Sequence, residues 1–303
     1  MALAPRSWLL LAPLPAIALG AAVAQRLSVP LRVFAPNLIA VLLGGALAWG
    51  LSRAGPEARA RGLRVLGVLA FVFLLATLRS AGMDGVHRWN SLGPVRLQAS
   101  AAFLPWLLAG VGVSAPRLRA LGLALVLGAQ LVHLAQPDAA QATALALGLL
   151  PLLVGGTLVR RGTGLALAAA LLLLAAASWT RVDPLAPVDH VERVLRLAFS
   201  WGPLWSLAAV IAQGLLLLPW VLARGQPGEA DARGRLAFAL YFATTVVVTF
   251  LGPFPVPVMG AGAGPVLGWY ALVTLLARPS SPERAPGPGR PRRQIPEPKA
   301  LDR

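Results

Sequence analysis

The hydrophobic residues of this chain gather in long runs that few polar residues interrupt. The segment from Leu165 to Trp179 contains no charged residue, and within Leu121 to Gln136 the only titratable side chain is His133. Runs of about 17 to 25 apolar residues match the bilayer core at a helical rise of about 1.5 Å per residue. The pattern predicts an all-α protein, a polytopic transmembrane helical bundle with about ten spans. The spans are expected at residues 8–24, 33–51, 64–79, 98–114, 119–135, 140–158, 164–180, 198–222, 236–252 and 263–277.

The composition agrees with a membrane protein and excludes several other classes. Of the 303 residues, 57% are apolar and 13% are charged, whereas a soluble domain carries about a quarter charged residues. The chain has no cysteine, which removes disulfide and thiolate chemistry. The net charge of +16 does not indicate nucleic-acid binding, because the arginines stand between apolar runs and not on one soluble face.

The distribution of cations predicts the orientation in the membrane. With the N-terminus in the cytoplasm, 19 of the 27 Lys and Arg residues fall in cytoplasmic segments. The sharpest local contrast is Arg160-Arg161, since the opposite loop at 136–139 has no cation. The positive-inside rule therefore predicts that both termini are cytoplasmic.

The predicted domain organisation is simple. Residues 1–278 form one transmembrane domain, and residues 279–303 form a basic, Pro-rich cytoplasmic tail that is expected to be disordered. The tail either anchors the topology or binds anionic lipid headgroups. The first 24 residues resemble a secretory signal that ends in Ala22-Val23-Ala24, but we expect this helix to be retained because the chain continues as a membrane protein.

Polar chemistry is expected at the outer rim of the bundle. None of the eleven carboxylates lies deep in a span, which argues against a transporter that relays protons through the membrane. Six carboxylates are predicted to be cytoplasmic. The five that face outward are Asp84, Asp138, Asp183, Asp189 and Glu192.

Three outer segments carry most of the polar and turn-forming residues. The first runs from Gly85 to Gly93 and is followed by Gln98-Ala99-Ser100; its Trp and Arg could simply anchor the chain at the interface. The second is Gln136-Pro137-Asp138, which could be a short turn closed by the aspartate. The third, Pro253 to Gly264, fits either a bent re-entrant segment or simple helix breaking.

In this order the three segments resemble the motifs of the SEDS family (shape, elongation, division and sporulation), the RodA and FtsW type of lipid II polymerase. The family's first motif, G-x-x-R-W-x-x-L-G followed by Q-P-S-E, its Q-P-D-L-G-T and its late P-x-P-x-x-S-x-G-G-S each match in part. The matching residues are Gly85, Arg88, Trp89, Leu92, Gly93, Gln98, Ser100, Gln136, Pro137, Asp138, Pro255, Pro257 and Gly262.

The chain departs from the family pattern at several positions. Alanine occupies the positions of the Q-P-S-E proline and glutamate, Ala99 and Ala101, and the serines of the late motif are Gly260 and Gly264. The large fourth outer loop of the family is reduced to about residues 181–196.

The resemblance implies a site in this shortened loop. The family's P-x-x-H-T-D ends in the presumed catalytic base, and here Pro187 and His190 match while Glu192 takes the aspartate position. We expect Arg193 and Arg196 to hold Glu192 ionised; Glu192 and Arg196 could instead form an ordinary helix-surface ion pair, and Asp189 could be the base. Arg88 and Trp89 are expected near Pro187–Glu192. The implied substrate-binding residues are Arg88, Trp89, Gln98, Asp138, His190, Arg193 and Arg196.

The resemblance implies a peptidoglycan glycosyltransferase of the bacterial cytoplasmic membrane that polymerises lipid II in cell shape or division. It implies a class B penicillin-binding protein transpeptidase and membrane lipids as partners, and no cofactor, with a divalent cation left open. One alternative is a catalytically degenerate homologue that serves as an interaction subunit of an envelope complex. The other is a lipid or small-molecule transporter, for which the only polar hints inside spans are Gln130, His133, Gln213, Thr244 and Thr245.

Overall fold

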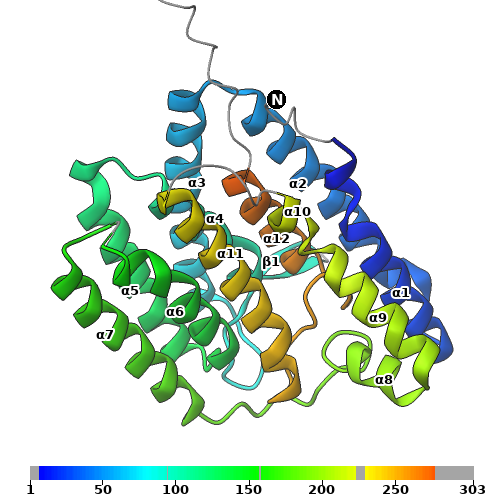
Figure 1. Ribbon diagram of the computed structural model, residues 1–303. Helices are drawn as coiled ribbons and strands as arrows, with labels where there is room; N and C mark the ends of the chain where they lie inside the picture. The colour runs from blue at the N-terminus through cyan, green and yellow to red at the C-terminus, as the bar shows by residue number, and fades with distance from the viewer. Residues whose placement is uncertain (1–6, 94, 157, 223–228, 277–303) are drawn as a thin grey trace, which may run out of the picture.

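The computed structural model describes residues 7–93, 95–156, 158–222 and 229–276, which form twelve α-helices and one β-hairpin (Figure 1). Short 3-10 turns stand at Ser7–Leu11, Leu31–Phe34, Thr77–Arg79, Pro116–Leu118 and Val248–Phe250. The helices are α1 (Pro13–Arg26), α2 (Ala35–Arg53), α3 (Pro56–Ala76), α4 (Ala99–Gly112), α5 (Arg119–Ala135), α6 (Ala139–Val154), α7 (Arg161–Trp179), α8 (Val194–Ser200), α9 (Pro203–Leu215), α10 (Leu218–Leu222), α11 (Glu229–Val247) and α12 (Ala263–Leu276). Strands β1 (Trp89–Leu92) and β2 (Val95–Gln98) pair antiparallel.

The predicted fold class is confirmed. Five helical segments are long and apolar enough to cross a membrane, and three shorter apolar helices stand beside them. The five are Trp8–Arg26, Leu31–Arg53, Pro56–Arg79, Pro116–Ala135 and Arg161–Trp179, and the three are Ala99–Gly112, Ala139–Val154 and Pro203–Leu215. The proposed boundary between residues 1–278 and the tail 279–303 stays a prediction, because it lies outside the described residues.

The eighth span differs from the prediction, which placed one helix over 198–222. The chain instead forms the short helix α8, turns at Gly202, and enters the bundle with α9 and α10. Gly202 has a φ of 113°, a conformation that glycine adopts without steric cost, and Pro203 then occupies the first turn of α9. A continuous apolar pattern hid this break, so the prediction was wrong in where the helix begins.

The outer helices of the bundle expose apolar side chains that would contact lipid. Leu42 of α2 is 72% exposed, Leu173 of α7 is 71% exposed, and Val65 and Val72 of α3 are each 53% exposed. An apolar surface spread over several helices is unfavourable in water and suited to a bilayer.

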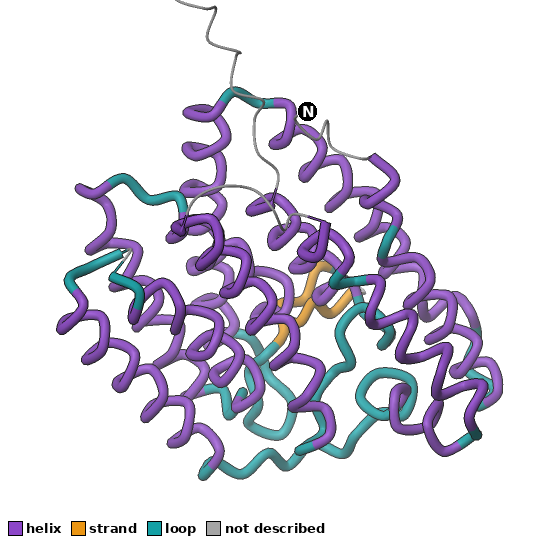
Figure 2. Tube along the Cα trace, viewed as in Figure 1, coloured by secondary structure: helices purple, strands orange, loops and turns teal. Residues whose placement is uncertain are grey.

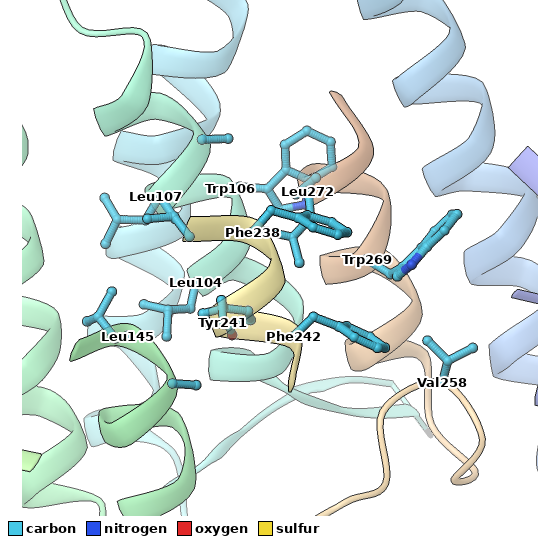
Figure 3. Close-up of a cluster of buried hydrophobic side chains, with 14 of the residues drawn as sticks. Leu104, Trp106, Leu107, Leu145, Phe238, Tyr241, Phe242, Val258, Trp269 and Leu272 are labelled. Carbon is cyan, nitrogen blue, oxygen red and sulfur yellow. The ribbon is translucent and has the colours of Figure 1, made fainter. Parts of the chain in front are cut away.

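The centre of the molecule is packed from α4, α6, α11 and α12. Trp106 of α4, Phe238 and Phe242 of α11, and Trp269 of α12 are buried together there (Figure 3). The backbones of α4 and α12 approach closely, because a Cβ at Gly268 would stand 2.1 Å from the Ala101 carbonyl oxygen. Small residues at such crossings let transmembrane helices pack backbone to backbone.

The polar side chains within helices mainly join neighbouring segments. Gln130 donates to the carbonyls of Ala142 at 3.0 Å and Leu171 at 2.9 Å, and Gln213 donates to the Pro257 carbonyl at 3.2 Å. Thr244 and Thr245 each donate to a carbonyl of their own helix. Gln130 and Gln213 therefore join neighbouring segments, whereas Thr244 and Thr245 bond within their own helix.

Candidate active site at the outer end of the bundle

Most of the longer loops gather at one end of the bundle, near α8 (Figure 2). This is the end that the cation distribution assigns to the outer face. It brings the first outer segment, the Gln136–Asp138 turn and the loop between α7 and α8 together.

The first outer segment folds into the hairpin that leads into α4. Trp89 of β1 stands opposite Gln98 of β2, and the Ala99 amide donates to the Arg88 carbonyl at 2.9 Å. Gly93, at a φ of 60°, begins the turn between the strands. Gln98 is buried while Trp89 is half-buried, so the hairpin turns the amide inward.

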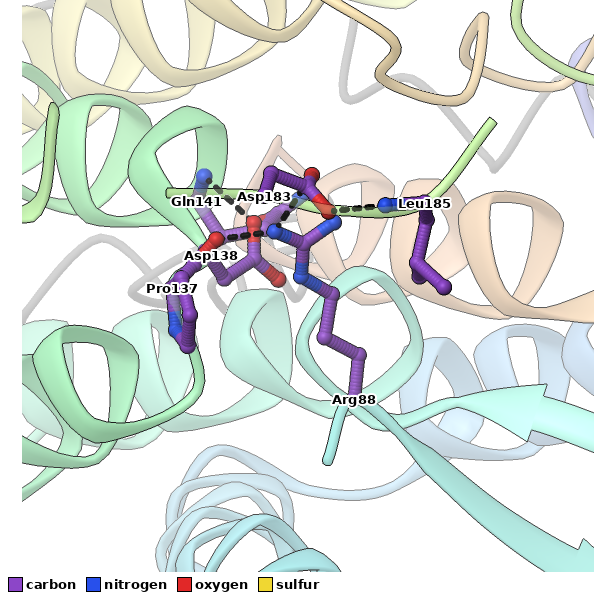
Figure 4. A network of polar contacts seen from close by, with 6 residues as sticks. All are labelled: Arg88, Pro137, Asp138, Gln141, Asp183 and Leu185. Carbon is purple, nitrogen blue, oxygen red and sulfur yellow. Dashed lines mark hydrogen bonds and ion pairs between the residues drawn. The ribbon is translucent and has the colours of Figure 1, made fainter. Parts of the chain in front are cut away.

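Arg88 connects three loops. Its guanidinium forms an ion pair with Asp183 at 2.8 Å and donates to the Pro137 carbonyl, and only 3% of its surface is exposed (Figure 4). Asp183 belongs to the loop after α7, and its other carboxylate oxygen accepts from the Leu185 amide at 3.2 Å. Arg88 therefore contacts the fourth outer loop at Asp183. The expected closeness of Arg88 and Trp89 to Pro187–Glu192 stays a prediction.

The Gln136–Asp138 turn is part of the same buried framework. Asp138 is fully buried and accepts from the Gln141 amide at 3.3 Å, which caps the N-terminus of α6. Gln136 donates to the Thr77 hydroxyl, so the turn also holds the end of α3. The side chain of Asp138 thus closes a turn, the simpler of its two interpretations.

A small cavity lies between this framework and the central core. Gln98, Ala101, Gln141, Tyr241, Thr245 and Pro257 are among the residues that line it, and the Tyr241 hydroxyl donates to the Gln141 side chain at 2.7 Å. Its volume of about 30 Å³ has room for water but not for a sugar ring. Ala101, at the position of the family's glutamate, contributes only a methyl group to the wall.

The segment from Pro253 to Gly262 is bent, non-helical and largely buried, as predicted for a re-entrant segment. Asn37 of α2 holds it with three hydrogen bonds: it donates to the carbonyls of Val258 at 3.2 Å and Gly260 at 2.9 Å, and accepts from the Gly262 amide at 2.7 Å. Val258 has a φ of 66°, which is unfavourable for a β-branched residue and persists only where surrounding contacts fix it. Asn37 supplies those contacts.

Glu192 closes a tight turn against this segment. Its carboxylate accepts from the Val188 amide at 2.5 Å, and its own amide donates to the Val188 carbonyl at 2.8 Å. Two further bonds join the turn to the re-entrant segment: the Val256 amide donates to Val191, and the Ala261 amide donates to His190, both at 3.0 Å. Pro257 of the re-entrant segment lines the small cavity. The loop that carries Glu192 is therefore hydrogen-bonded to a segment of the cavity wall.

The electrostatic environment of Glu192 differs from the one predicted. Burial raises the pKa of Glu192 to about 7, against the lowering effects of its backbone hydrogen bonds and of the Arg88 charge. Arg193 instead pairs with Asp189 at 3.4 Å, and Arg196 donates to the Thr249 carbonyl at 2.9 Å. The expectation that these two cations hold Glu192 ionised is wrong, and so is the alternative ion pair between Glu192 and Arg196.

His190 fixes the turn mainly through its backbone. Burial lowers the pKa of its imidazole, and the neighbouring Asp189 charge opposes that shift. Asp189 and Arg193 are each about half exposed, at 49% and 51%. Within the described ranges, no three His, Asp or Glu side chains gather closely enough to hold a metal ion.

Sequence reasoning missed three contributors to this end of the molecule. Asp183 is among the five outward carboxylates, but the sequence gives no sign that it is the counter-charge of Arg88. Asn37 is the one strongly polar side chain in the first four turns of α2, and Tyr241 is one of only two tyrosines. A polar side chain inside a span is itself a signal, because it must find a partner there.

The fold is similar to that of several solved structures. No family model matches the sequence, and no curated protein matches it. The rod shape determining protein RodA of Thermus thermophilus is 21% identical and superposes with a TM-score of 0.66, covering 91% of this chain and 96% of that chain; a point mutant of it gives 0.67. A chain of a peptidoglycan synthase complex, described for its coordination of polymerization and crosslinking, is 22% identical with a TM-score of 0.64, covering 91% of this chain and 97% of that chain. The resemblance to the SEDS family is thus confirmed at the level of the fold: this chain has the fold of RodA.

Proposed function

We propose that this chain is a peptidoglycan glycosyltransferase that polymerises lipid II at the outer face of the bacterial cytoplasmic membrane. The observation that carries the proposal is Glu192, a half-buried carboxylate without a cation partner of its own, on the outer loop that matches the family's catalytic segment. The RodA-like fold supports the reaction class by analogy.

In the proposed reaction, a sugar hydroxyl of one lipid II molecule attacks the anomeric carbon of another. The hydroxyl proton passes to the Glu192 carboxylate, the new carbon–oxygen bond forms, and the bond to the diphosphate breaks with its electron pair leaving on the diphosphate. A general base performs best when its pKa lies near the working pH, as the pKa of Glu192 near 7 does. The Val188 amide occupies only the Oε2 atom of the carboxylate, so the substrate hydroxyl would approach Oε1.

The remaining candidate residues take different parts in this proposal. Arg193 and Arg196 are exposed beside Glu192 and could stabilise the departing diphosphate. Trp89 and His190 are half-buried at the same end and could contact the sugar or lipid, and Gln98 reaches the cavity. Arg88 and Asp138 are buried in the framework, so we assign them to shaping the site.

The test uses the purified full-length chain, with lipid II and separation of the glycan products. Glu192→Gln keeps the shape of the side chain and removes its charge, and we expect a loss of about 10²- to 10⁴-fold in rate, the usual contribution of a general base. Asp189→Asn is the matched control on the same loop and should keep the wild-type rate. Loss of activity in the control alone would make Asp189 the base, and full activity in both variants would refute this site.

A second candidate function is that of a non-catalytic subunit of an envelope complex. Ala101 and the small cavity favour it, because the cavity wall has no carboxylate at the family's glutamate position. In either function we propose a class B penicillin-binding protein transpeptidase as the partner, in keeping with the peptidoglycan synthase complex that shares the fold. Wild-type protein that binds such a partner but forms no glycan, alone or in the complex, would establish the second function.

The membrane location can be tested separately. Reporter fusions after Arg303 and in the turn at Asp138 should report opposite sides of the membrane, with Arg303 in the cytoplasm. An outward C-terminus would overturn the orientation and, with it, the assignment of Glu192 to the outer face.

A further inference from the structure

A second and larger cavity opens on the other half of the bundle, between α3, α4 and α5. Its volume is about 370 Å³, more than twice the roughly 150 Å³ that accommodates a benzene ring in an apolar protein cavity. Leu107 and Val111 of α4 are buried in its wall, while Val68 and Leu69 of α3 and Leu121 of α5 are 42–52% exposed around it. It is therefore an apolar groove that faces the surrounding lipid.

Glycines let the three helices around the groove pack closely. At the crossing of α3 and α4, a Cβ on Gly110 would stand 2.8 Å from the Leu63 carbonyl and 3.3 Å from the Cα of Gly67. On the α5 side, a Cβ on Gly122 would stand 3.2 Å from a methyl group of Val111, its nearest neighbour. The helices therefore approach closely at these glycines, which also line the groove.

One end of the groove is cationic. Arg61 and Arg64 line it, and no acidic residue does. Arg64 donates to the Val113 carbonyl at 3.4 Å, and in the part of the chain that the structure describes neither arginine has an ion-pair partner. The two arginines follow Pro56, the first residue of α3, by five and eight positions, or about 8 and 12 Å along the helix axis. At that depth a long arginine side chain can reach the headgroup layer.

We propose that this groove binds one anionic glycerophospholipid of the leaflet on the cation side, which is the cytoplasmic leaflet in the predicted orientation. One acyl chain lies along Leu107, Val111 and Leu121, and the phosphate meets Arg61 and Arg64. Negative charge on the lipid complements a cation pair that has no ion-pair partner among the described residues.

Two other occupants fit less well. The chain's own segment 279–303 is basic, with six Lys or Arg residues against three acidic ones, so the two arginines would repel it. A polyprenyl diphosphate substrate would present its charge at the opposite end of the bundle, beside Glu192. The lipid site is therefore distinct from the proposed active site, and its failure would leave the proposed function untouched.

The test measures lipids retained by the purified full-length chain in native mass spectrometry. The probes are phosphatidylglycerol and phosphatidylcholine with identical acyl chains. Wild-type protein should retain phosphatidylglycerol at least tenfold more tightly, and the double variant Arg61→Gln/Arg64→Gln should lose that preference. The control variant Arg53→Gln/Arg117→Gln removes two exposed cations that are outside the groove lining. It should keep the preference for phosphatidylglycerol.

A second variant tests the groove itself. Gly122→Leu places a side chain in the cavity and should reduce retention of both lipids, provided that its thermal unfolding matches that of the wild type. Equal retention of the two lipids by wild-type protein would overturn the proposal, as would an unchanged preference in Arg61→Gln/Arg64→Gln. So would displacement of phosphatidylglycerol by a polyprenyl diphosphate, or a dimer that Gly122→Leu dissociates.

Discussion

Asp183 and Glu192 lie nine positions apart in one outer loop and have opposite surroundings. Asp183 stands 2.8 Å from the guanidinium of Arg88, which is almost completely buried, and so serves as its counter-ion. Glu192 is also withdrawn from water, yet its hydrogen bonds come from backbone amides and its pKa is raised to about 7. The Asp183 carboxylate serves a structural ion pair, and the Glu192 carboxylate remains available for proton transfer.

The comparison teaches how a shortened loop can still present a site. The ion pair of Asp183 fastens the beginning of the loop to the hairpin and to the Gln136–Asp138 turn. The hydrogen bonds of His190 and Val191 fasten its end to the re-entrant segment. Between these two attachments the loop needs no helix or sheet of its own to hold Glu192 in place.

The largest expected effect on stability comes from breaking the framework at Arg88. Arg88→Met leaves Asp183 near the interior without its cation, and removal of one partner of a buried pair costs about 3–5 kcal/mol. The measurement is thermal unfolding of the purified protein in detergent. Arg193→Met, which breaks the half-exposed pair with Asp189, is the control and should change the unfolding temperature little. Equal shifts for the two variants would contradict the contrast between the pairs.

The next effect concerns the re-entrant segment. Asn37→Ala removes three hydrogen bonds and leaves the carbonyls of Val258 and Gly260 and the amide of Gly262 without their partner. Each of these hydrogen bonds makes a net contribution of about 0.5–1.5 kcal/mol, or about 1.5–4.5 kcal/mol for the three, so unfolding should occur at a clearly lower temperature. Asn90→Ala, which removes one hydrogen bond to the Phe73 carbonyl at the surface, is the matched control. If both variants melt alike, Asn37 does not hold the segment.

The raised pKa of Glu192 gives a prediction about pH. A base with a pKa of about 7 is ionised above that value, so the polymerisation rate should fall about tenfold for each pH unit below it. Stability should change in the opposite direction. The folded protein holds this proton up to about pH 7, while the unfolded chain releases it near pH 4.5, so ionisation opposes folding as pH rises between those values.

The variant Glu192→Gln tests the stability part separately from the rate, because a glutamine side chain does not titrate. The variant should melt at a higher temperature than the wild type at pH 8, and the difference should shrink towards pH 4.5. A wild-type rate that does not change between pH 5.5 and pH 8 would show that Glu192 is not the base.

Much of this arrangement could be predicted from the sequence. The apolar runs predict the bundle, and the three motifs in order predict that the outer loops meet at one end. Pro253 to Gly264 predicts a bent segment, since prolines and glycines at a membrane edge cannot continue a helix. These features depend on local composition and on the side of the membrane, both of which a sequence carries.

The partners of individual charges could not be predicted in the same way. Arg193 and Arg196 are one and four positions from Glu192 in the sequence. The spacing does not show that α8 begins only at Val194. Nor does it show that the Glu192 side chain accepts a hydrogen bond from the Val188 amide. The pairing of Arg88 with Asp183 joins residues 95 positions apart and depends on how the loop after α7 lies against the residue that precedes β1. Such contacts are set by the tertiary structure alone.

The smallest expected effect is at Asp189, and it completes the comparison of acidic groups in this loop. The pair with Arg193 is at the surface, with the two side chains 49% and 51% exposed and a separation of 3.4 Å. Exposed ion pairs contribute about 0.2–1 kcal/mol, so Asp189→Asn should shift the unfolding temperature by only about a few degrees at most. A double-mutant cycle with Arg193→Gln measures the coupling directly, and screening at about 1 M salt should abolish it. Coupling above roughly 1 kcal/mol, or coupling that persists in high salt, would mean that the pair is more enclosed than its exposure indicates. Asp189 would then be part of the framework, as Asp183 is, and Glu192 alone would remain uncommitted among the three.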